Sequence, residues 1–191
     1  MMTKGFLRAA VVAALFVGLT AAASAQVTVS GGIAVSSMEV KGISGFDSDV
    51  GLGANLFVDY LLPISVPMSL GFELGFDTAS VSANSQKVTG NAIPLLLRAA
   101  YHFDLMANLD LYVVGKVGYV VGFADTPAGT EDGFGGVGFG FDVGAAYYFN
   151  SRIGVFAEAG YERYGIEKED SGYTIETPFS RFIIIGISTK F

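Results

Sequence analysis

The chain has no cysteine and no tryptophan, and only 15% of its 191 residues are charged. Without cysteine there can be no disulfide framework, no zinc finger and no cysteine nucleophile. Typical soluble domains are about 25% charged, so this composition is unusual for a soluble protein. The few charges are mainly acidic, 18 against 11 basic residues, and the resulting net charge of −7 argues against nucleic acid as a partner.

The first 25 residues have the pattern of a cleavable secretory signal peptide. Lys4 and Arg8 give it a basic start, an apolar run follows, and residues 23–25 offer an A-x-A cleavage site. The apolar run is too short for a membrane-spanning helix, and a retained amphipathic anchor is the alternative interpretation. Cleavage would leave residues 26–191 as a single domain, with 9 basic and 18 acidic residues and a charge of −9.

Long hydrophobic runs are also missing from the mature chain. No stretch after the leader approaches 18 consecutive apolar residues, which argues against a transmembrane helix. Yet 51% of the residues are hydrophobic. A membrane protein without such helices has one remaining architecture, the closed β-barrel, in which every backbone hydrogen bond is made between strands.

Apolar residues recur at every second position, which is the period of a β-strand. In residues 68–77, for example, Met, Leu, Phe, Leu and Phe alternate with Ser, Gly, Glu, Gly and Asp. Eight segments alternate in this way: 27–36, 49–60, 68–77, 92–103, 109–123, 137–149, 152–162 and 183–191. Eight is an even number, and the segments are long enough to cross a bilayer at a tilt. The sequence therefore predicts an all-β fold, an eight-stranded antiparallel up-and-down transmembrane barrel.

Loop lengths and aromatic residues favour a membrane barrel over a soluble barrel of the lipocalin type. The first, third, fifth and seventh connections are long and the other three are short, which places all long connections on one rim and both termini on the other. Outward aromatic residues are expected in two bands, as at the two interfaces of a membrane. The band at the short-turn rim comprises Tyr60, Tyr101, Phe103, Tyr147, Phe149 and Phe191. The band at the long-loop rim comprises Phe76, Tyr119, Phe123, Phe139 and Tyr161.

With these features the mature chain resembles the small eight-stranded bacterial outer-membrane barrels, the family of OmpX and the transmembrane domain of OmpA. The resemblance covers the whole mature chain and rests on the leader, the strand count, the loop asymmetry and the terminal Phe191. It implies an outer-membrane protein embedded in lipid, with extracellular long loops and periplasmic termini. It also implies that the barrel-assembly machinery reads a signal in the last strand, formed by Ile183, Ile185, Ile187 and Phe191. Thr189 departs from the aromatic residue that the family often has there.

Five charged residues fall on the polar face at about the same height of the barrel. They are Glu73, Arg98, Lys116, Asp142 and Glu158. Buried charges are tolerated only when they are paired and hydrogen-bonded, so we expect one internal ion-pair network. Strict alternation also directs Phe182 and Ile184 into the lumen, which favours a closed interior. Because eight strands leave just enough room for side chains, a filled lumen is expected, with a narrow gated channel for small solutes as the alternative.

The sequence favours a protein that is not an enzyme and needs no metal or cofactor. His102 is the only histidine, and nothing nearby forms a convincing Ser/His/acid set, so we interpret it as structural. Glu158 and Glu162 share a face, but about 13 Å of strand separates them, too far for a close carboxylate dyad. The Gly-rich stretch 133–140 lacks the lysine and the following helix of a phosphate loop and is interpreted as easing the bend of a strand.

The long connections are the remaining candidate surface. Residues 39–49, 125–132 and 167–176 are acidic and polar. They are candidates to bind lipopolysaccharide through bridging divalent cations, or an unknown surface ligand, and solvated loops without a partner are the alternative. The expected function is envelope structure or surface interaction.

Overall fold

The computed structural model describes residues 27–38, 47–83, 86–126, 129–170, 173–176 and 179–191. The predicted signal peptide, residues 1–25, and residues 39–46 of the first long connection lie outside the described residues. Within the described ranges, no helix is long and apolar enough to cross a membrane.

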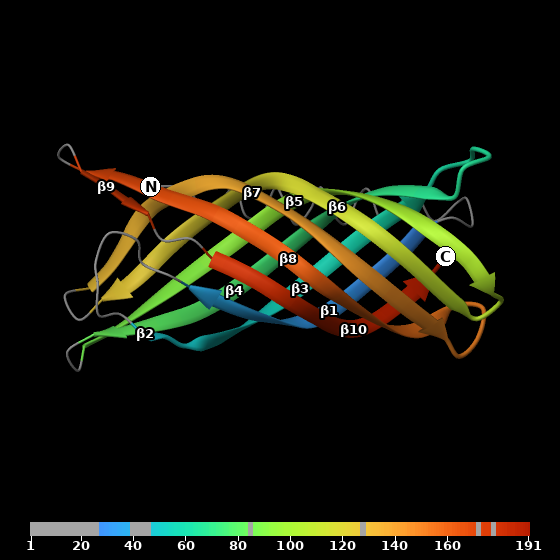
Figure 1. The fold of residues 1–191 in the computed structure, drawn as a ribbon, viewed down its shortest axis with the longest axis horizontal. Coiled ribbons are helices and arrows are strands. Elements are labelled where there is room, and N and C mark those ends of the chain that lie inside the picture. Colours follow the sequence, from blue (N-terminus) through green and yellow to red (C-terminus); the bar gives the residue numbers. More distant parts are fainter. Residues whose placement is uncertain (1–26, 39–46, 84–85, 127–128, 171–172, 177–178) are drawn as a thin grey trace.

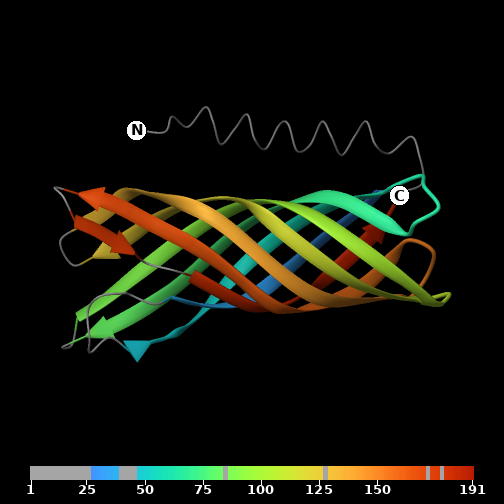
Figure 2. The same cartoon turned by 45° about the horizontal axis from the view of Figure 1, so that its top comes forward.

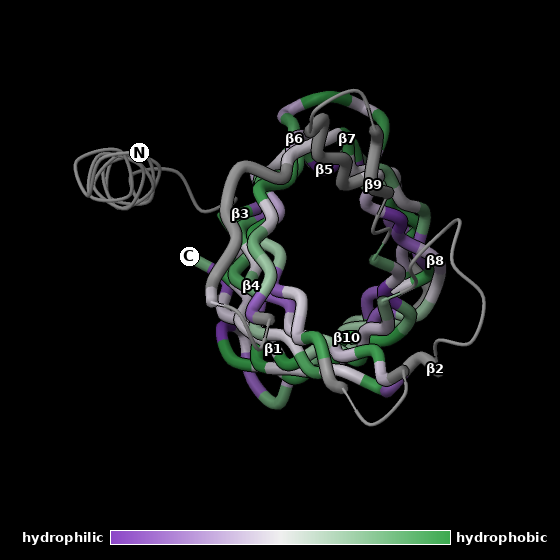
Figure 3. Tube along the Cα trace, turned by 90° about the vertical axis from the view of Figure 1, so that its left-hand side faces the viewer, coloured by the Kyte–Doolittle hydropathy of each residue, from purple (hydrophilic) through white to green (hydrophobic). Residues whose placement is uncertain are grey.

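One antiparallel sheet curls into a closed barrel (Figure 1, Figure 3). Its segments are β1 (Val27–Met38), β2 (Asp47–Ser48), β3 (Val50–Leu61), β4 (Met68–Ala83), β5 (Gln86–Met106), β6 (Leu109–Thr126), β7 (Gly129–Tyr148), β8 (Ile153–Asp170), β9 (Tyr173–Glu176) and β10 (Phe179–Lys190). Consecutive long strands pair with each other, and β10 pairs with both β8 and β1, which closes the ring. The short segments β2 and β9 pair with β4 and β8 beyond the ends of β3 and β10. Eight strands therefore span the barrel, and the predicted eight-stranded all-β fold is confirmed.

The alternating sequence gives each strand an apolar face and a polar face, and the apolar face points outward. Leu52, Phe139 and Ile187 remain 62%, 53% and 61% exposed, respectively. Their polar neighbours along the strands point into the barrel, where Asn55 and Ser188 are buried. A soluble barrel keeps its apolar side chains inside, whereas a membrane barrel turns them toward lipid. The direction of the two faces therefore identifies a membrane barrel.

The two rims of the barrel differ (Figure 1, Figure 2). At the short-turn rim, residues 62–67, 107–108 and 149–152 connect neighbouring strands. The chain also ends there, where the backbone N–H of Phe191 donates to the carbonyl oxygen of Val27 at 2.8 Å. The opposite rim, which we call the hairpin rim, carries the other ends of the strands and both short segments, β2 and β9.

Three of the predicted long loops are wrong in detail. Residues 78–90, 124–135 and 165–178 were expected to be loops, but β4 continues to Ala83, β7 begins at Gly129 and β8 continues to Asp170. Most of these residues pair across the hairpins, for example Thr78 with Asn91. They were missed because their outward positions lack the apolar side chains that marked the other strand segments.

The last strand is irregular at Phe182. Along β1, Val35 pairs with Ile183 and Ser36 pairs with Arg181, so Phe182 is an extra residue in β10. A β-bulge of this kind breaks strict alternation. Arg181 therefore points into the barrel, whereas Phe182 is 41% exposed on the outside. The predicted inward direction of Phe182 is wrong, while Ile184 is buried in the lumen as expected.

Outward aromatic residues pair with one another toward both rims. On the short-turn side the pairs are Tyr101–Phe103 and Tyr147–Phe149, with ring centroids 5.0 and 5.7 Å apart. On the hairpin side the pairs are Phe76–Phe123 and Tyr161–Phe182, with ring centroids 6.4 and 6.1 Å apart. The bulge thus adds Phe182 to the aromatic residues on the hairpin side.

Candidate functional site inside the barrel

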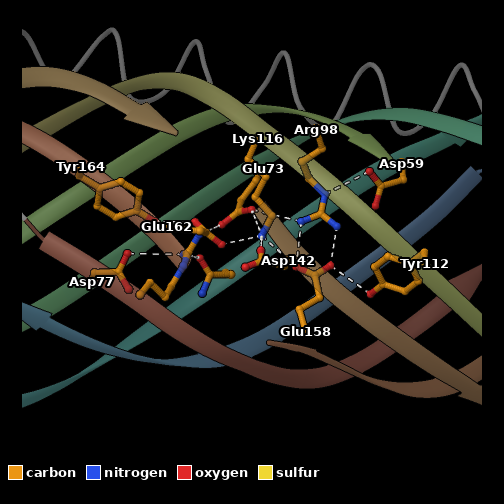
Figure 4. Close-up of polar contacts among 12 residues, drawn as sticks. Asp59, Glu73, Asp77, Arg98, Tyr112, Lys116, Asp142, Glu158, Glu162 and Tyr164 are labelled. Atoms are coloured by element: carbon orange, nitrogen blue, oxygen red, sulfur yellow. Dashed lines mark hydrogen bonds and ion pairs between the residues drawn. The ribbon is translucent and has the colours of Figure 1, made fainter. Parts of the chain in front are cut away.

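Charged side chains from seven of the eight spanning strands meet in the middle of the lumen (Figure 4). We call this group the ion-pair layer. It comprises the cations of Arg98, Lys116 and Arg181 and the carboxylates of Asp59, Glu73, Asp77, Asp142, Glu158 and Glu162. Their side chains are at most 4% exposed, except for that of Asp59 at 16%. The layer is therefore almost fully removed from solvent.

Lys116 on β6 is held by four carboxylates. Its Nζ lies 2.6 Å from Glu162 Oε1, 2.7 Å from Asp142 Oδ2, 2.8 Å from Glu158 Oε2 and 3.1 Å from Glu73 Oε2. The first three of these residues come from β7 and β8, and Glu73 comes from β4. Among the described side chains, Asp142 has no cation other than Lys116 as an ion-pair partner. This one ammonium therefore connects opposite walls of the barrel.

Arg98 on β5 binds carboxylates from three strands. Its Nη2 and Nη1 lie 2.6 and 3.2 Å from the two oxygens of Glu158, a bidentate geometry that suits the planar guanidinium. Nη1 also lies 3.2 Å from Glu73 Oε2, and Nε lies 3.2 Å from Asp59 Oδ1. The guanidinium carbon stands 4.2 Å from the ring centroid of Phe57. Each edge of Arg98 is thus occupied by protein groups.

Arg181 on β10 completes the layer from the other side. Its guanidinium donates to Glu73, Glu162 and Asn55, and Nη1 lies 3.5 Å from Asp77 Oδ2. Glu73 therefore contacts all three cations of the layer. The layer is one connected network rather than a set of separate pairs.

Apolar side chains form clusters in the lumen on both sides of the layer. The cluster on the hairpin side comprises Met38, Ala79, Val81, Ala92, Leu96, Val120, Tyr164 and Phe179. The cluster on the short-turn side comprises Ala34, Phe57, Ala100, Tyr112, Val114, Ala146, Tyr148, Phe156 and Ile184. Two phenols link these clusters to the charges, since Tyr112 donates to Glu158 and Tyr164 donates to Glu162, both at 3.0 Å. The apolar neighbours lower the local dielectric constant, which strengthens the ionic contacts inside.

Glycines in β7 make room for this packing. A Cβ added at Gly144 would stand 2.2 Å from Cζ of Tyr112, and one at Gly140 would stand 2.4 Å from Cγ of Glu162. The sequence suggested that the Gly-rich stretch eases the bend of a strand. The structure also gives Gly140, the last residue of that stretch, a packing role beside the ion-pair layer.

The structure brings together all five residues of the expected network and adds four more. The expected five are Glu73, Arg98, Lys116, Asp142 and Glu158, and the additional four are Asp59, Asp77, Glu162 and Arg181. Alternation already places the three additional acids on the polar face, but it places Arg181 on the apolar face because it cannot anticipate the bulge. Glu158 and Glu162, which are separated along their strand, converge because both reach Lys116.

A second polar cluster lies at the short-turn end of the lumen. Ser69 Oγ is 2.9 Å from His102 Nε2, and His102 Nδ1 is 2.9 Å from Asp110 Oδ1. The expectation that no Ser/His/acid set surrounds His102 is wrong, because neighbouring strands bring together residues that are distant in the sequence. A cavity of about 180 Å³ is lined by these three side chains together with Tyr148 and Lys190.

The outward face carries the residues of the expected assembly signal and the guanidinium of Arg163. Ile183, Ile185, Ile187 and Phe191 are between 47% and 61% exposed on the lipid side. Arg163 lies on the outward face of β8 and donates from Nη1 to the Tyr161 hydroxyl at 3.4 Å. A shallow groove beside it is lined by Gly135, Gly136, Val137, Phe139, Arg163 and Gly165.

A closed sheet with an apolar exterior and a buried ionic interior defines an integral membrane β-barrel. Residues 9–191 match the outer membrane protein beta-barrel domain family. The chain belongs to this family, and it is an outer-membrane protein embedded in the lipid bilayer. The predicted membership of the small outer-membrane barrels is confirmed.

Solved structures of other outer-membrane proteins share the fold. Neisserial surface protein A is 17% identical, with 86% of this chain and 97% of that chain covered and a TM-score of 0.60. Ail, the attachment invasion locus protein of Yersinia pestis, is 14% identical, with 88% and 99% covered and a TM-score of 0.52. Outer membrane protein W of E. coli is 12% identical, with 88% and 98% covered and a TM-score of 0.50. No curated protein sequence matches the chain.

Proposed function

We propose that this protein is a closed outer-membrane barrel that serves envelope structure or surface interaction and does not transport solutes through its lumen. The ion-pair layer between two apolar clusters carries this proposal. Six carboxylates and three cations hold one another across the lumen, so a passing solute would have to break several buried contacts. An eight-stranded barrel offers little space beyond what its own side chains fill.

Conductance separates this closed barrel from the alternative, a narrow channel for small solutes. Purified protein in a planar bilayer is expected to give a quiet baseline. Steady ohmic steps that Arg98→Ala or Glu73→Gln abolishes would instead show a pore that depends on the ion-pair layer. Arg152→Ala is the control, because Arg152 is exposed in a short turn and lies outside the layer.

The orientation is also part of the proposal. Residues 1–25 act as a cleaved signal peptide, residues 26–191 form the barrel domain, the hairpin rim faces the outside of the cell, and the termini face the periplasm. The support is the concentration of short turns and the chain end at one rim, as in other outer-membrane barrels. Because the chain has no cysteine, single cysteines report on this directly.

A membrane-impermeant maleimide should label Asp49→Cys on intact cells but label Ser151→Cys only after the outer membrane is opened. Both positions are exposed, the first beside β2 at the hairpin rim and the second in a short turn. The reverse pattern would overturn the proposed orientation.

The surface partners follow from the hairpin rim and the outward face. The acidic stretches 39–49, 125–132 and 167–176 are proposed to meet divalent cations, lipopolysaccharide or another surface ligand. Residues 39–46, 127–128 and 171–172 of these stretches lie outside the described residues. Arg163 supports lipopolysaccharide as a ligand, because its outward guanidinium beside a groove suits a phosphate group of that lipid. Thermal stabilisation by lipopolysaccharide should fall in Arg163→Ala and persist in Arg152→Ala. Equal stabilisation in both variants would remove Arg163 from the proposal.

The last strand is proposed to carry the signal for the barrel-assembly machinery through Ile183, Ile185, Ile187 and Phe191. All four lie on the outer surface, where another protein can read them. Phe191→Ala should slow insertion in cells several-fold and leave refolding in detergent unchanged. Equal slowing in both settings would indicate a role in folding alone.

A further inference from the structure

The short-turn end of the lumen holds polar groups that the envelope role does not use. We propose that Ser69, His102 and Asp110 form a nucleophile, base and acid set that cleaves small carboxylic esters entering from the short-turn rim. This activity goes beyond the proposed function and occupies a different part of the barrel.

The hydrogen bonds have the connectivity that such a set needs. Asp110 Oδ1 lies 2.9 Å from His102 Nδ1 and accepts a hydrogen bond from Nδ1–H, which leaves Nε2 as the hydrogen-bond acceptor of the ring. Nε2 faces the Ser69 hydroxyl at 2.9 Å, the distance at which a base withdraws the proton of a serine nucleophile. A histidine with an acid on one nitrogen and a serine on the other is thereby fixed in both tautomer and orientation.

Strand pairing holds the three groups in place. Ser69 on β4 lies opposite Ala100, two residues before His102 on β5. Tyr112 on β6 pairs with His102, and the ring centroids of these two residues are 5.5 Å apart. Asp110 lies two residues before Tyr112 on the same strand. The backbone N–H of His102 donates to Pro67 at 2.8 Å. Sites built on paired strands are more rigid than sites built on loops.

The adjoining cavity gives the set access to small molecules. It measures about 180 Å³ and is also lined by residues 106–110 and Lys190 at the short-turn rim, while Arg98 and Glu158 of the ion-pair layer lie at its inner end. The side chains of His102 and Asp110 are 18% and 19% exposed. The cavity is therefore a blind pocket that suits a short acyl ester.

Lys190 adds a positive charge to the same pocket. Its Nζ stands 3.8 Å above the ring centroid of Tyr148 and 3.9 Å from Asp110 Oδ2, and it lines the cavity. A positive group near a reacting carbonyl offsets the negative charge that develops on its oxygen. Lys190 is the candidate for that role here.

The reaction balances with water as the second substrate. Ser69 Oγ bonds to the ester carbonyl carbon while its proton moves to His102 Nε2. The bond from that carbon to the alcohol oxygen then breaks, and the alcohol leaves with the proton. Water next attacks the acyl-serine and gives a proton to Nε2, after which the acid departs and Ser69 recovers its proton. In both steps Asp110 keeps its hydrogen bond from His102 Nδ1–H and stabilises the imidazolium.

A fluorophosphonate probe tests the nucleophile in the refolded mature barrel in detergent. The expected result is covalent labelling at Ser69, found by peptide mass spectrometry, with a rate that falls at least tenfold in Ser69→Ala and His102→Gln. Ser188→Ala is the matched control and should keep the label, because Ser188 lines the same cavity but bonds to Ser30 and Tyr148. Heat-dependent gel migration shows which variants are folded.

Two further readouts separate catalysis from a structural role. Asp110→Asn should keep the fold and lose about tenfold in labelling rate, and p-nitrophenyl acetate should be turned over by the wild type but not by Ser69→Ala. The proposal is overturned if the folded wild type is not labelled, if labelling falls on another serine, or if His102→Gln leaves the rate unchanged. None of these outcomes affects the conductance test of the closed barrel.

Discussion

The ion-pair layer and the Ser69–His102–Asp110 cluster occupy neighbouring heights of one lumen, yet they are built differently. Each cation of the layer contacts at least three carboxylates, and an apolar cluster lies on each side of the layer. The Ser69–His102–Asp110 cluster has single contacts of 2.9 Å, partly exposed side chains at His102 and Asp110, and a cavity beside it. The buried charges of the layer are occupied by one another, whereas the polar groups of the Ser69–His102–Asp110 cluster lie beside a cavity that a ligand can enter.

Removal of the central cation should have the largest effect on stability. Lys116→Met leaves four carboxylates without their shared ammonium, and breaking a buried ionic contact costs about 3–5 kcal/mol. Urea unfolding in phospholipid vesicles, followed by gel migration, measures the loss. Lys190→Met is the control at the other region and should lose less than about 1 kcal/mol, because its ion pair is 3.9 Å long and 42% of the lysine side chain is exposed. Equal losses would erase the distinction between the two regions.

A smaller effect is expected where a glycine makes room for the layer. Gly144→Ala should destabilise the barrel by about 1–3 kcal/mol, because the new methyl group displaces Tyr112 from Glu158. Gly115→Ala should change stability by no more than about 0.5 kcal/mol, since nothing lies within 4 Å of its added Cβ. A Gly144→Ala barrel as stable as Gly115→Ala would show that the lumen beside β7 is loosely packed.

The smallest effect on stability is expected in the cluster. Asp110→Asn should cost less than about 1 kcal/mol, because the pair with His102 is partly exposed. The same variant should nevertheless slow fluorophosphonate labelling, so the two readouts diverge. A loss of several kcal/mol would place Asp110 among the groups that hold the fold.

Much of this molecule follows from alternation of its residues. The period of two predicts eight strands and places Glu73, Arg98, Lys116 and Asp142 on one polar face. The loop lengths and the aromatic bands, rather than the alternation, predict that this face points inward. Alternation fails at Phe182, because one extra residue in β10 turns Arg181 from the outward to the inward face and the sequence does not mark this bulge. It also stops short at the hairpin rim, where polar outward residues continue the strands.

The contacts within the ion-pair layer and within the Ser69–His102–Asp110 cluster depend on strand register, which alternation does not predict. Ser69 and Asp110 both fall on the polar face by alternation, but only the pairing of β4, β5 and β6 brings them to His102 at one height. The same holds for the convergence of Glu158 and Glu162 on Lys116. The face on which a side chain lies can be predicted from its own strand, whereas the side chains that it contacts depend on how neighbouring strands pair.

Two double-mutant cycles, measured by urea unfolding in the same vesicles, test most directly whether the layer and the cluster differ as described. One combines Arg98→Met with Glu158→Gln in the layer, and the other combines His102→Gln with Asp110→Asn in the cluster. We expect a coupling free energy of about 2–3 kcal/mol for the first pair and less than about 1 kcal/mol for the second. Equal coupling energies, or a value below about 1 kcal/mol for Arg98 and Glu158, would contradict a barrel closed by its buried ionic layer.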